Sequence, residues 1–339
     1  MRDDKVVERK PASVARTERR RILFRLAFIC HPLFAIGHSL RLQMAPIIDC
    51  HIHMYPPEVF ANPIAWGIAR REPWWTECVA PANRATIQGW ADIPRLLADM
   101  DRSGIERCVM LGWYWERQLT CDEQNSWSIE WVREHPGRLS AFAAVQPAAG
   151  QQALDALQRA LDAGLCGIGE ILPQAQGFTF DDPYWEQVVG IAMERNLPIN
   201  LHVTDPLTMS DAVTMPTPLR DYLSLAQRFP TAKFIFAHWG GGIPFYELNP
   251  RIRPYLKNVW YDTAASPLIY DVRVFRQVID LIGADRIMFG SDYPLLLYPR
   301  KIREPAFDRF LEEIAAAGLN TEEKEKILGA NFSRLMNEC

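Results

Sequence analysis

The chain has 339 residues, 48% of them hydrophobic and 23% charged, which is enough apolar material to bury a large core. Residues 1–43 carry ten Lys and Arg against four Asp and Glu, whereas residues 44–339 carry 27 against 37, a net charge of −10. The net negative charge of residues 44–339 argues against phosphate-backbone binding as the main activity, so we expect a small-molecule substrate and no nucleic-acid partner.

The first 43 residues differ from the rest of the chain. A basic stretch precedes an apolar run that Arg25 and Pro32 interrupt, so we expect no membrane span. The basic start is compatible with a secretory or transit signal, although no small-residue cleavage pattern follows it. Because a strand pattern begins directly after Met44, we interpret 1–43 as a leader that is disordered or upstream of the true start, and 44–339 as one domain.

Beyond the leader, short apolar runs alternate with longer amphipathic ones. The predicted strands are 46–53, 105–112, 138–146, 165–171, 198–204, 233–239, 258–264 and 286–292. The predicted helices are 93–104, 121–137, 151–164, 182–196, 217–230, 243–256, 271–284, 306–318 and 322–336. Several of these helices begin with DP, TP or NTEE and end in Gly, Asn or Pro, which are helix start and stop signals.

This alternation predicts an α/β fold, a (β/α)8 TIM barrel. Strand–helix pairs in strict order indicate parallel strands joined by right-handed crossovers, and continuous apolar strands are typical of sheets covered on both faces. Eight such strands close into a barrel. An open doubly wound sheet is the alternative, but no GxGxxG or Walker loop follows the first strand. The Pro- and Trp-rich segment 54–89 is expected to be an insertion that caps the barrel mouth.

The seven cysteines lie without CxxC or CxxH spacing. This pattern indicates free thiols in a reducing compartment rather than a disulfide framework or a cysteine-built zinc site, so we predict a cytoplasmic protein. The Trp- and Leu-rich helices are also compatible with a homodimer.

Polar residues gather where the predicted strands end, which is the edge at which barrels of this kind carry their active sites. Four of the five histidines after Met44 occupy strand ends, and His135 is the exception. In chain order, the polar residues at strand ends are His51, His53, Glu170, His202, His238, Asp262 and Asp292.

His51 and His53 are two residues apart, so both side chains leave the same face of the first strand and can bind one ion. An HxH pair alone is equally well explained as structural, and a single strand histidine such as His202 is often a hydrogen-bonded core residue. Glu170 and Asp292 each follow an apolar strand, where an ionised carboxylate needs a cation or strong hydrogen bonds. Three imidazoles with carboxylates together predict a site for zinc or another first-row divalent ion.

Several other polar and aromatic residues can each be interpreted as either structural or functional. His238 opens AHWGGG, which either forms only a tight turn or directs the imidazole toward a substrate, and we favour the second. Asp262 is either a hydrogen-bonding partner of the site or a helix cap. Trp113, Trp115 and Arg117 follow the second strand in WYWER and are candidate substrate-binding residues, with ordinary packing under the cap as the alternative for the aromatic rings.

As a set, IIDCHIH, NLHVT, AHWGGG and FGSDYP resemble the amidohydrolase superfamily. They are most similar to its amidohydrolase-related branch of metal-dependent TIM-barrel hydrolases and nonoxidative decarboxylases, over residues 46–336. The resemblance implies that His51, His53, His202 and Asp292 hold the metal.

The same resemblance implies that His238 is the acid/base that faces the substrate and that Asp292 takes a proton from metal-bound water. GIGEI is similar to the TatD-type hydrolases, which implies that Glu170 is also a metal ligand. A second ion bound by His202 and His238 therefore remains open, and we expect one ion, zinc.

We expect a metal-dependent hydrolase that uses a metal-activated water to cleave an amide, ester or lactone bond of a small, neutral or carboxylated substrate. The alternative on the same ligands is a nonoxidative decarboxylase of the aminocarboxymuconate-semialdehyde decarboxylase type. A TatD-like nuclease is disfavoured by the acidic body, and a non-catalytic binding barrel by the complete ligand set.

Overall fold

The computed structural model describes residues 46–207, 215–298 and 301–337, and residues 44–339 group into one compact unit. The predicted leader, residues 1–43, lies outside the described residues, so the expectations for it stay predictions. Every helix among the described residues is too short or too polar to cross a bilayer.

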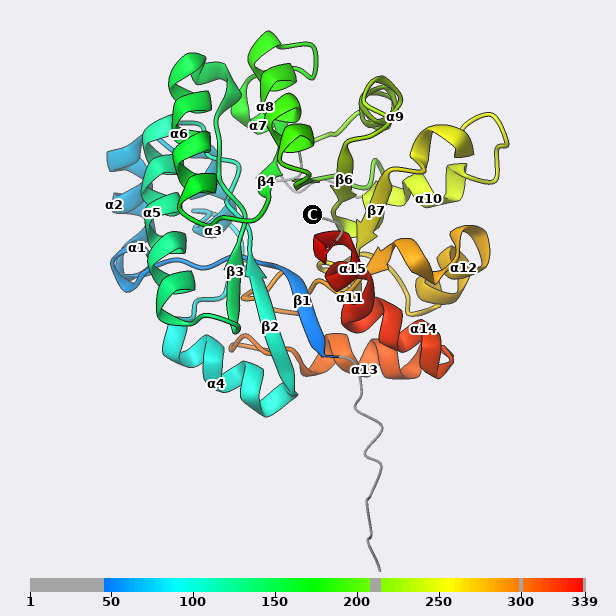
Figure 1. The fold of residues 1–339 in the computed structure, drawn as a ribbon. Coiled ribbons are helices and arrows are strands. Elements are labelled where there is room, and N and C mark those ends of the chain that lie inside the picture. The colour runs from blue at the N-terminus through cyan, green and yellow to red at the C-terminus, as the bar shows by residue number, and fades with distance from the viewer. Residues whose placement is uncertain (1–45, 208–214, 299–300, 338–339) are drawn as a thin grey trace, which may run out of the picture. The chain divides into compact units, whose positions relative to one another are not determined.

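Eight parallel strands form the centre of this unit (Figure 1). Pairing joins β1 through β3 in one run and β4 through β8 in another. The ring closes between the runs, because a bridge joins Ala143 to Ile168 and the amide of Cys50 donates to the carbonyl of Phe289 at 2.9 Å. The predicted barrel is therefore confirmed. Its strands are β1 (Ile47–Ile52), β2 (Ile105–Met110), β3 (Leu139–Ala141), β4 (Ile168–Ile171), β5 (Pro198–Leu201), β6 (Lys233–Phe236), β7 (Val259–Asp262) and β8 (Ile287–Met288).

Except at β4, whose predicted end coincides with the observed one, the predicted strands run past the observed ones at their C-terminal ends. For β8 the prediction reached residue 292, but the strand ends at Met288, and Asp292 has a φ of 66°, which no extended strand allows. Residues 289–292 are buried like those of the strand, yet they lie outside the strand ladder.

Helices surround the strands in Figure 1. Local signals define several of them: in α4, for example, the Asp92 side chain accepts the Arg95 amide and Gly104, with φ of 70°, ends the helix. The helices after the capping segment are α4 (Ile93–Ser103), α5 (Gln118–Glu134), α6 (Gln151–Asp162), α7 (Pro173–Gln176), α8 (Pro183–Glu194), α9 (Leu219–Arg228), α10 (Ile243–Tyr246), α11 (Ser266–Ile269), α12 (Arg273–Ile282), α13 (Asp308–Ala316), α14 (Thr321–Glu325) and α15 (Asn331–Asn337).

Helix α5 begins earlier than predicted, at Gln118 rather than Cys121. The buried carboxylate of Glu72 accepts the amides of Glu116 and Arg117, at 2.8 and 3.1 Å, just before the first turn. A negative charge at a helix N-terminus is stabilising. The start of this helix is thus set by a residue about 45 positions earlier, which no local pattern reveals.

The predicted helix 243–256 is wrong over most of its length. Only α10 and a 3-10 turn at Arg253–Leu256 form there. Pro250 and Pro254 explain the break, because proline has no amide to donate to the preceding turn.

The predicted insertion after β1 contains α1 (Pro57–Ala61), α2 (Pro63–Arg70) and α3 (Pro73–Val79). Each of the three begins with a proline, whose fixed φ suits the first helical position. Its apolar side is built around Trp75, whose ring centroid lies 4.9 to 6.4 Å from those of Tyr55, Trp66, Trp90 and Trp115. This aromatic cluster attaches the cap to the barrel.

Replacing Trp75 with alanine is expected to lower the free energy of unfolding by about 3–5 kcal/mol, because a fully buried indole leaves a cavity. Urea unfolding followed by circular dichroism measures the change. Ile68→Ala, in a side chain of the same cap that is 69% exposed, should change it by less than about 0.5 kcal/mol. Equal losses in the two variants would contradict the packing described for Trp75.

Candidate metal centre and substrate cavity

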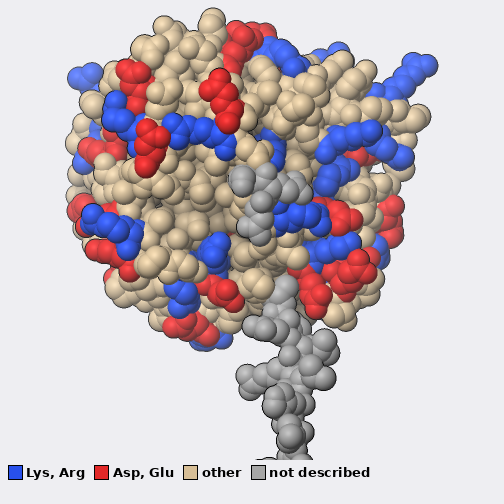
Figure 2. All heavy atoms as spheres, viewed as in Figure 1, with Lys and Arg blue, Asp and Glu red and all other residues tan. Residues whose placement is uncertain are grey.

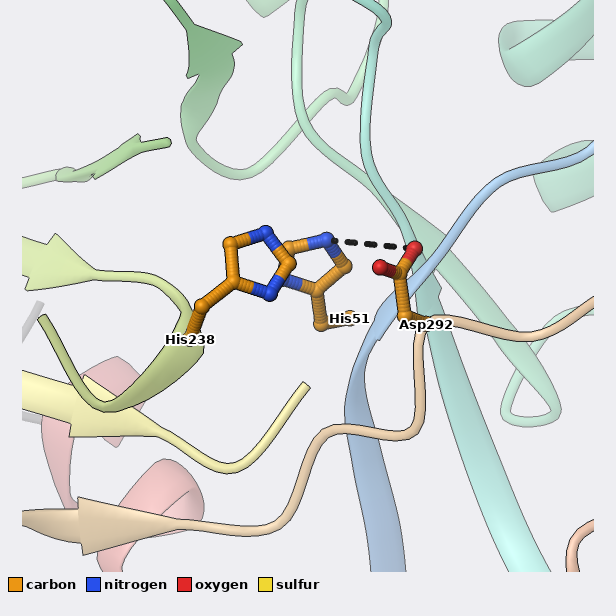
Figure 3. A group of neighbouring side chains, drawn as sticks. All are labelled: His51, His238 and Asp292. Carbon is orange, nitrogen blue, oxygen red and sulfur yellow. Dashed lines mark ion pairs between the residues drawn. The ribbon is translucent and has the colours of Figure 1, made fainter. Parts of the chain in front are cut away.

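Six polar side chains meet where the strands end. All five predicted metal-binding residues are among them, and of these only His202 is partly exposed. Figure 3 shows three of the six converging from separate segments of the chain. The six are His51 in β1, His53 just after it, Glu170 in β4, His202 after β5, His238 after β6 and Asp292 after β8.

The first donor group consists of His51, His53, Glu170 and Asp292. The Nε2 atoms of His51 and His53 are 3.2 Å apart, and Oε2 of Glu170 lies 3.9 and 3.4 Å from them. Oδ1 of Asp292 lies 3.8 and 3.6 Å from the same two nitrogens. Four tetrahedral ligands at about 2.1 Å from one ion would be roughly 3.4 Å apart. Each carboxylate is therefore spaced from the two imidazoles as a ligand of the same divalent ion would be.

The other oxygen of Glu170 faces a second donor group. Oε1 lies 2.8 Å from Nδ1 of His202 and 3.4 Å from Nε2 of His238, and those two nitrogens are 3.1 Å apart. His202 thus lies with His238 rather than with the His51–His53 pair. Glu170 offers one oxygen to each group, which is the arrangement that a carboxylate bridging two ions would need.

The charges of the site favour a cation. Among the described residues, no Lys or Arg forms an ion pair with Glu170, Asp262 or Asp292. Burial opposes ionisation of Glu170, but the adjacent imidazoles, His202 first, outweigh it and hold the pKa of this carboxyl well below its ordinary value. Burial likewise opposes protonation of His51, yet the carboxylates around it raise its pKa to about 10. Buried carboxylates so close together require positive charge, so the donor set fits a divalent ion.

Asp262, the last residue of β7, orients two of the histidines. One carboxylate oxygen accepts from Nδ1 of His51 at 2.9 Å and from the amide of Asn200 at 3.1 Å, and the other accepts the backbone N–H of His238 at 3.0 Å. A proton held on Nδ1 leaves the lone pair of His51 Nε2 free for an ion. Of the two readings of Asp262, the structure shows the hydrogen-bonding partner.

A left-handed turn positions His238. Residues 238–242 all have positive φ, between 56° and 87°. A Cβ on Gly240 would come within 2.8 Å of the Tyr261 ring, so this position requires glycine on both grounds. Nδ1 of His238 lies 3.1 Å from the Ala264 carbonyl, which accepts a hydrogen bond from the Nδ1–H and leaves Nε2 facing the other site residues. The glycines therefore both form the turn and direct the imidazole.

Asp292 also has a left-handed backbone, which aspartate tolerates better than most residues. Its amide donates to the carbonyl of His51 at 2.9 Å. Asp49 reinforces this junction, because one of its oxygens accepts the amides of His51 and Ser291 at 3.0 and 3.1 Å. The backbone thus holds the Asp292 carboxylate beside the His51–His53 pair, where Figure 3 marks its approach to His51.

A cavity of about 470 Å³ lies over the donors, and its wall is mostly apolar. The predicted Trp113 lines it, with its ring centroid 5.6 Å from that of His53. Sequence reasoning missed Tyr114 and Arg84, which also line it. Arg84 is the one Lys or Arg in the described wall, and its Nε is buried without a hydrogen-bond partner. Tyr114 lay within the WYWER motif, whereas nothing local distinguishes Arg84 in the insertion.

The remaining two predicted substrate-binding residues lie elsewhere. Trp115 is fully buried in the aromatic cluster, and its indole N–H donates to Gln124. Arg117 borders a separate surface hollow, together with Arg70 and Arg71. Trp115 therefore supports the cap, and Arg117 is not part of the described cavity wall.

A family model described as amidohydrolase matches residues 48–335. An L-fucono-1,5-lactonase of Burkholderia ambifaria is 24% identical over 267 residues, which cover 73% of this chain and 80% of that protein. A 2-amino-3-carboxymuconate-6-semialdehyde decarboxylase of Dictyostelium discoideum is 24% identical over 261 residues, 66% of this chain and 68% of that protein. A solved 5-carboxyvanillate decarboxylase of Novosphingobium aromaticivorans, complexed with manganese and 4-hydroxy-3-methoxy-5-nitrobenzoic acid, has a TM-score of 0.68 at 18% identity and covers 86% of this chain and 96% of its own.

Asp262→Asn is expected to weaken metal binding by about 10- to 100-fold. The amide would present a donor to His51 Nδ1, so the imidazole would take the other tautomer and lose the Nε2 lone pair that faces the ion. Competition with a chelating dye measures the affinity of each variant for Zn²⁺. Asp271→Asn, at an exposed carboxylate outside the site, is the matched control. Equal affinities in the two variants would show that Asp262 does not orient a ligand.

Proposed function

Because the chain belongs to the amidohydrolase family, whose model spans residues 48–335, we propose that this enzyme is a metal-dependent hydrolase of an amide, ester or lactone bond in a small substrate. The lactonase relative supports lactones as the first class to test. The cytoplasmic location and the homodimer stay predictions.

One observation carries the proposal: two candidate proton-transfer groups, Asp292 and His238, both lie beside His51 (Figure 3). Candidate ligand atoms of His51, His238 and Asp292 all lie within 4.8 Å of one another. Hydrolysis needs one group to accept a proton from water and another to stabilise or protonate the substrate oxygen. Two such groups within reach of one small substrate meet that need.

The roles follow from the surroundings of each side chain. Asp292, held beside the histidine pair by its backbone, accepts the proton of water and passes it to the leaving group. Burial opposes protonation of His238, but hydrogen bonding to Glu170 and the charge of Asp292 raise its pKa above the ordinary value. The raised pKa favours the protonated imidazole, which can donate a hydrogen bond to the substrate carbonyl.

We propose that the metal is one zinc ion, held by the first donor group. Two imidazoles and two carboxylates form a nitrogen and oxygen set that suits zinc and also manganese. When bound, the ion would polarise a substrate oxygen and lower the pKa of a coordinated water toward about 7. With one ion, His202 and His238 keep their ring nitrogens for hydrogen bonds to Glu170 and the substrate.

The cavity limits the substrate to a small and largely apolar molecule. Its volume of about 470 Å³ is typical of small-molecule sites, and aromatic and aliphatic side chains form most of its wall. On the face drawn in Figure 2, acidic and basic side chains of the described residues are interspersed, which supports a small-molecule substrate over a nucleic acid.

Decarboxylation is the second candidate, and Arg84 is the observation that favours it. Arg84 brings the one guanidinium to the described cavity wall, where it can receive a substrate carboxylate. The Dictyostelium relative is named as a decarboxylase. The two reactions differ in their products, because a lactonase releases acid without CO2, whereas a decarboxylase releases CO2 and consumes a proton.

Zinc-loaded protein is expected to hydrolyse dihydrocoumarin, an aryl lactone, with acid release followed by a pH indicator. Asp292→Asn should lower kcat by about 100- to 10,000-fold, because the proton acceptor is lost. Asp271→Asn should leave kcat unchanged. CO2 release from hydroxybenzoates, with no lactone or ester hydrolysed, would contradict the hydrolase proposal and support the decarboxylase.

Metal analysis of the purified protein should find about one ion per chain. Glu170→Gln should weaken its binding, because one of the four donors loses its charge. Elemental analysis after equilibration with limiting and excess Zn²⁺ gives both stoichiometry and affinity. Two ions in the wild type falling to one in the variant would contradict the single-ion proposal and make His238 a ligand instead of an acid.

A further inference from the structure

Tyr114 follows β2 and forms part of the cavity wall. Its ring stacks on Trp113, with centroids 4.2 Å apart and an angle of 29°, and is tilted against the His202 imidazole at 5.4 Å. Trp113 in turn packs edge-on against His53. The two aromatic rings therefore connect the first donor group to the second, and Tyr114 is held in place by its neighbours.

The hydroxyl of Tyr114 sets it apart from the other buried tyrosines. Across the described residues five tyrosines are buried, and a buried phenol normally finds a hydrogen-bond partner. Four of them have one: Tyr55 accepts from Trp75, Tyr222 donates to the His202 carbonyl, Tyr261 pairs with Glu247 and Tyr293 with Asp99. Within the described residues, the Tyr114 hydroxyl has no hydrogen-bond partner. It is also absent from the polar atoms that are fully shielded from solvent without a partner.

Packing alone does not explain a tyrosine at this position. A phenylalanine would stack on Trp113 and contact His202 equally well, without an unpaired hydroxyl. Burial, together with nearby groups that include Glu170 and Asp292, raises the pKa of the Tyr114 phenol well above its ordinary value. Even an ordinary phenol keeps its proton at neutral pH. Because Tyr114 lines the cavity, its hydroxyl can donate a hydrogen bond there.

We propose that the Tyr114 hydroxyl donates a hydrogen bond to the substrate carbonyl oxygen as negative charge develops on it. The inference rests on the proposed hydrolysis and adds a catalytic residue to Asp292 and His238. The phenol forms and breaks no covalent bond and retains its proton throughout. A donor held in place before the reaction stabilises the charge that appears in the transition state, so the effect falls on kcat rather than on substrate affinity.

The test compares Tyr114→Phe with wild type in dihydrocoumarin hydrolysis. We expect kcat to fall by about 100-fold, as for the loss of one oxyanion donor, with KM changed by less than about 3-fold. Bound metal and unfolding midpoint should stay at wild-type values. Tyr246→Phe, which removes a hydroxyl from a residue that is 54% exposed, is the matched control and should behave as wild type. An unchanged kcat, or a rise in KM alone, would overturn the proposal.

A binding measurement separates this proposal from the proposed function. Phenylphosphonate carries tetrahedral anionic oxygens, and its dissociation constant for zinc-loaded protein can be measured by calorimetry without turnover. Tyr114→Phe should weaken its binding by about 10-fold, as expected for a lost hydrogen bond to a charged group. An inactive wild type would contradict the hydrolase assignment alone. Equal dissociation constants for the two proteins would overturn the role of Tyr114 whether or not the wild type is active.

Discussion

A buried negative charge is the constraint on which the site depends. Glu170 lies in β4, shielded from water, where an unpaired carboxylate would cost several kcal/mol. Its two oxygens face histidines from β1 on one side and histidines after β5 and β6 on the other. Strands far apart in sequence must therefore end at the same level along the barrel axis, around Glu170. A divalent ion in the first donor group would complete the balance of charge, so folding of the barrel and metal binding are expected to support each other.

The site divides into a rigid part and a part that determines what enters. The candidate ligands lie at strand ends and are oriented by neighbours such as Asp262, which accepts hydrogen bonds from both the His51 side chain and the His238 backbone amide. Beyond the donors themselves, the cavity wall comes from the loop after β2, the cap and the later loops. This division allows one set of ligands to serve hydrolysis or decarboxylation, because the wall decides how a substrate oxygen or carboxylate is presented. Tyr114 and Arg84 are the wall residues that make this difference testable.

Prediction succeeded where a residue's role follows from its position on a regular element. The eight strands, the order of helices and the convergence of His51, His53, Glu170, His202 and Asp292 all follow from periodicity and from the rule that parallel strands end at one edge. It failed at 243–256, where prolines break a pattern that otherwise reads as helix, and at the start of α5, which depends on the distant carboxylate of Glu72. In WYWER, alternate residues were assigned to the cavity, but the irregular loop turns Trp115 into the aromatic cluster and exposes Tyr114 to the cavity instead.

The amino-acid sequence by itself determined the barrel, the identity of the candidate ligands and the chemistry their side chains can support, because these depend on local spacing and residue type. Only the tertiary structure decided how the ligands group. It places His202 with His238, gives each oxygen of Glu170 a different set of partners, and assigns Asp262 to orientation. Those relations are distances between residues 24 or more positions apart in the chain, set by barrel register and by the left-handed turns at His238 and Asp292. Side-chain distances across a barrel arise from packing of the whole chain, so no local sequence pattern could have specified them.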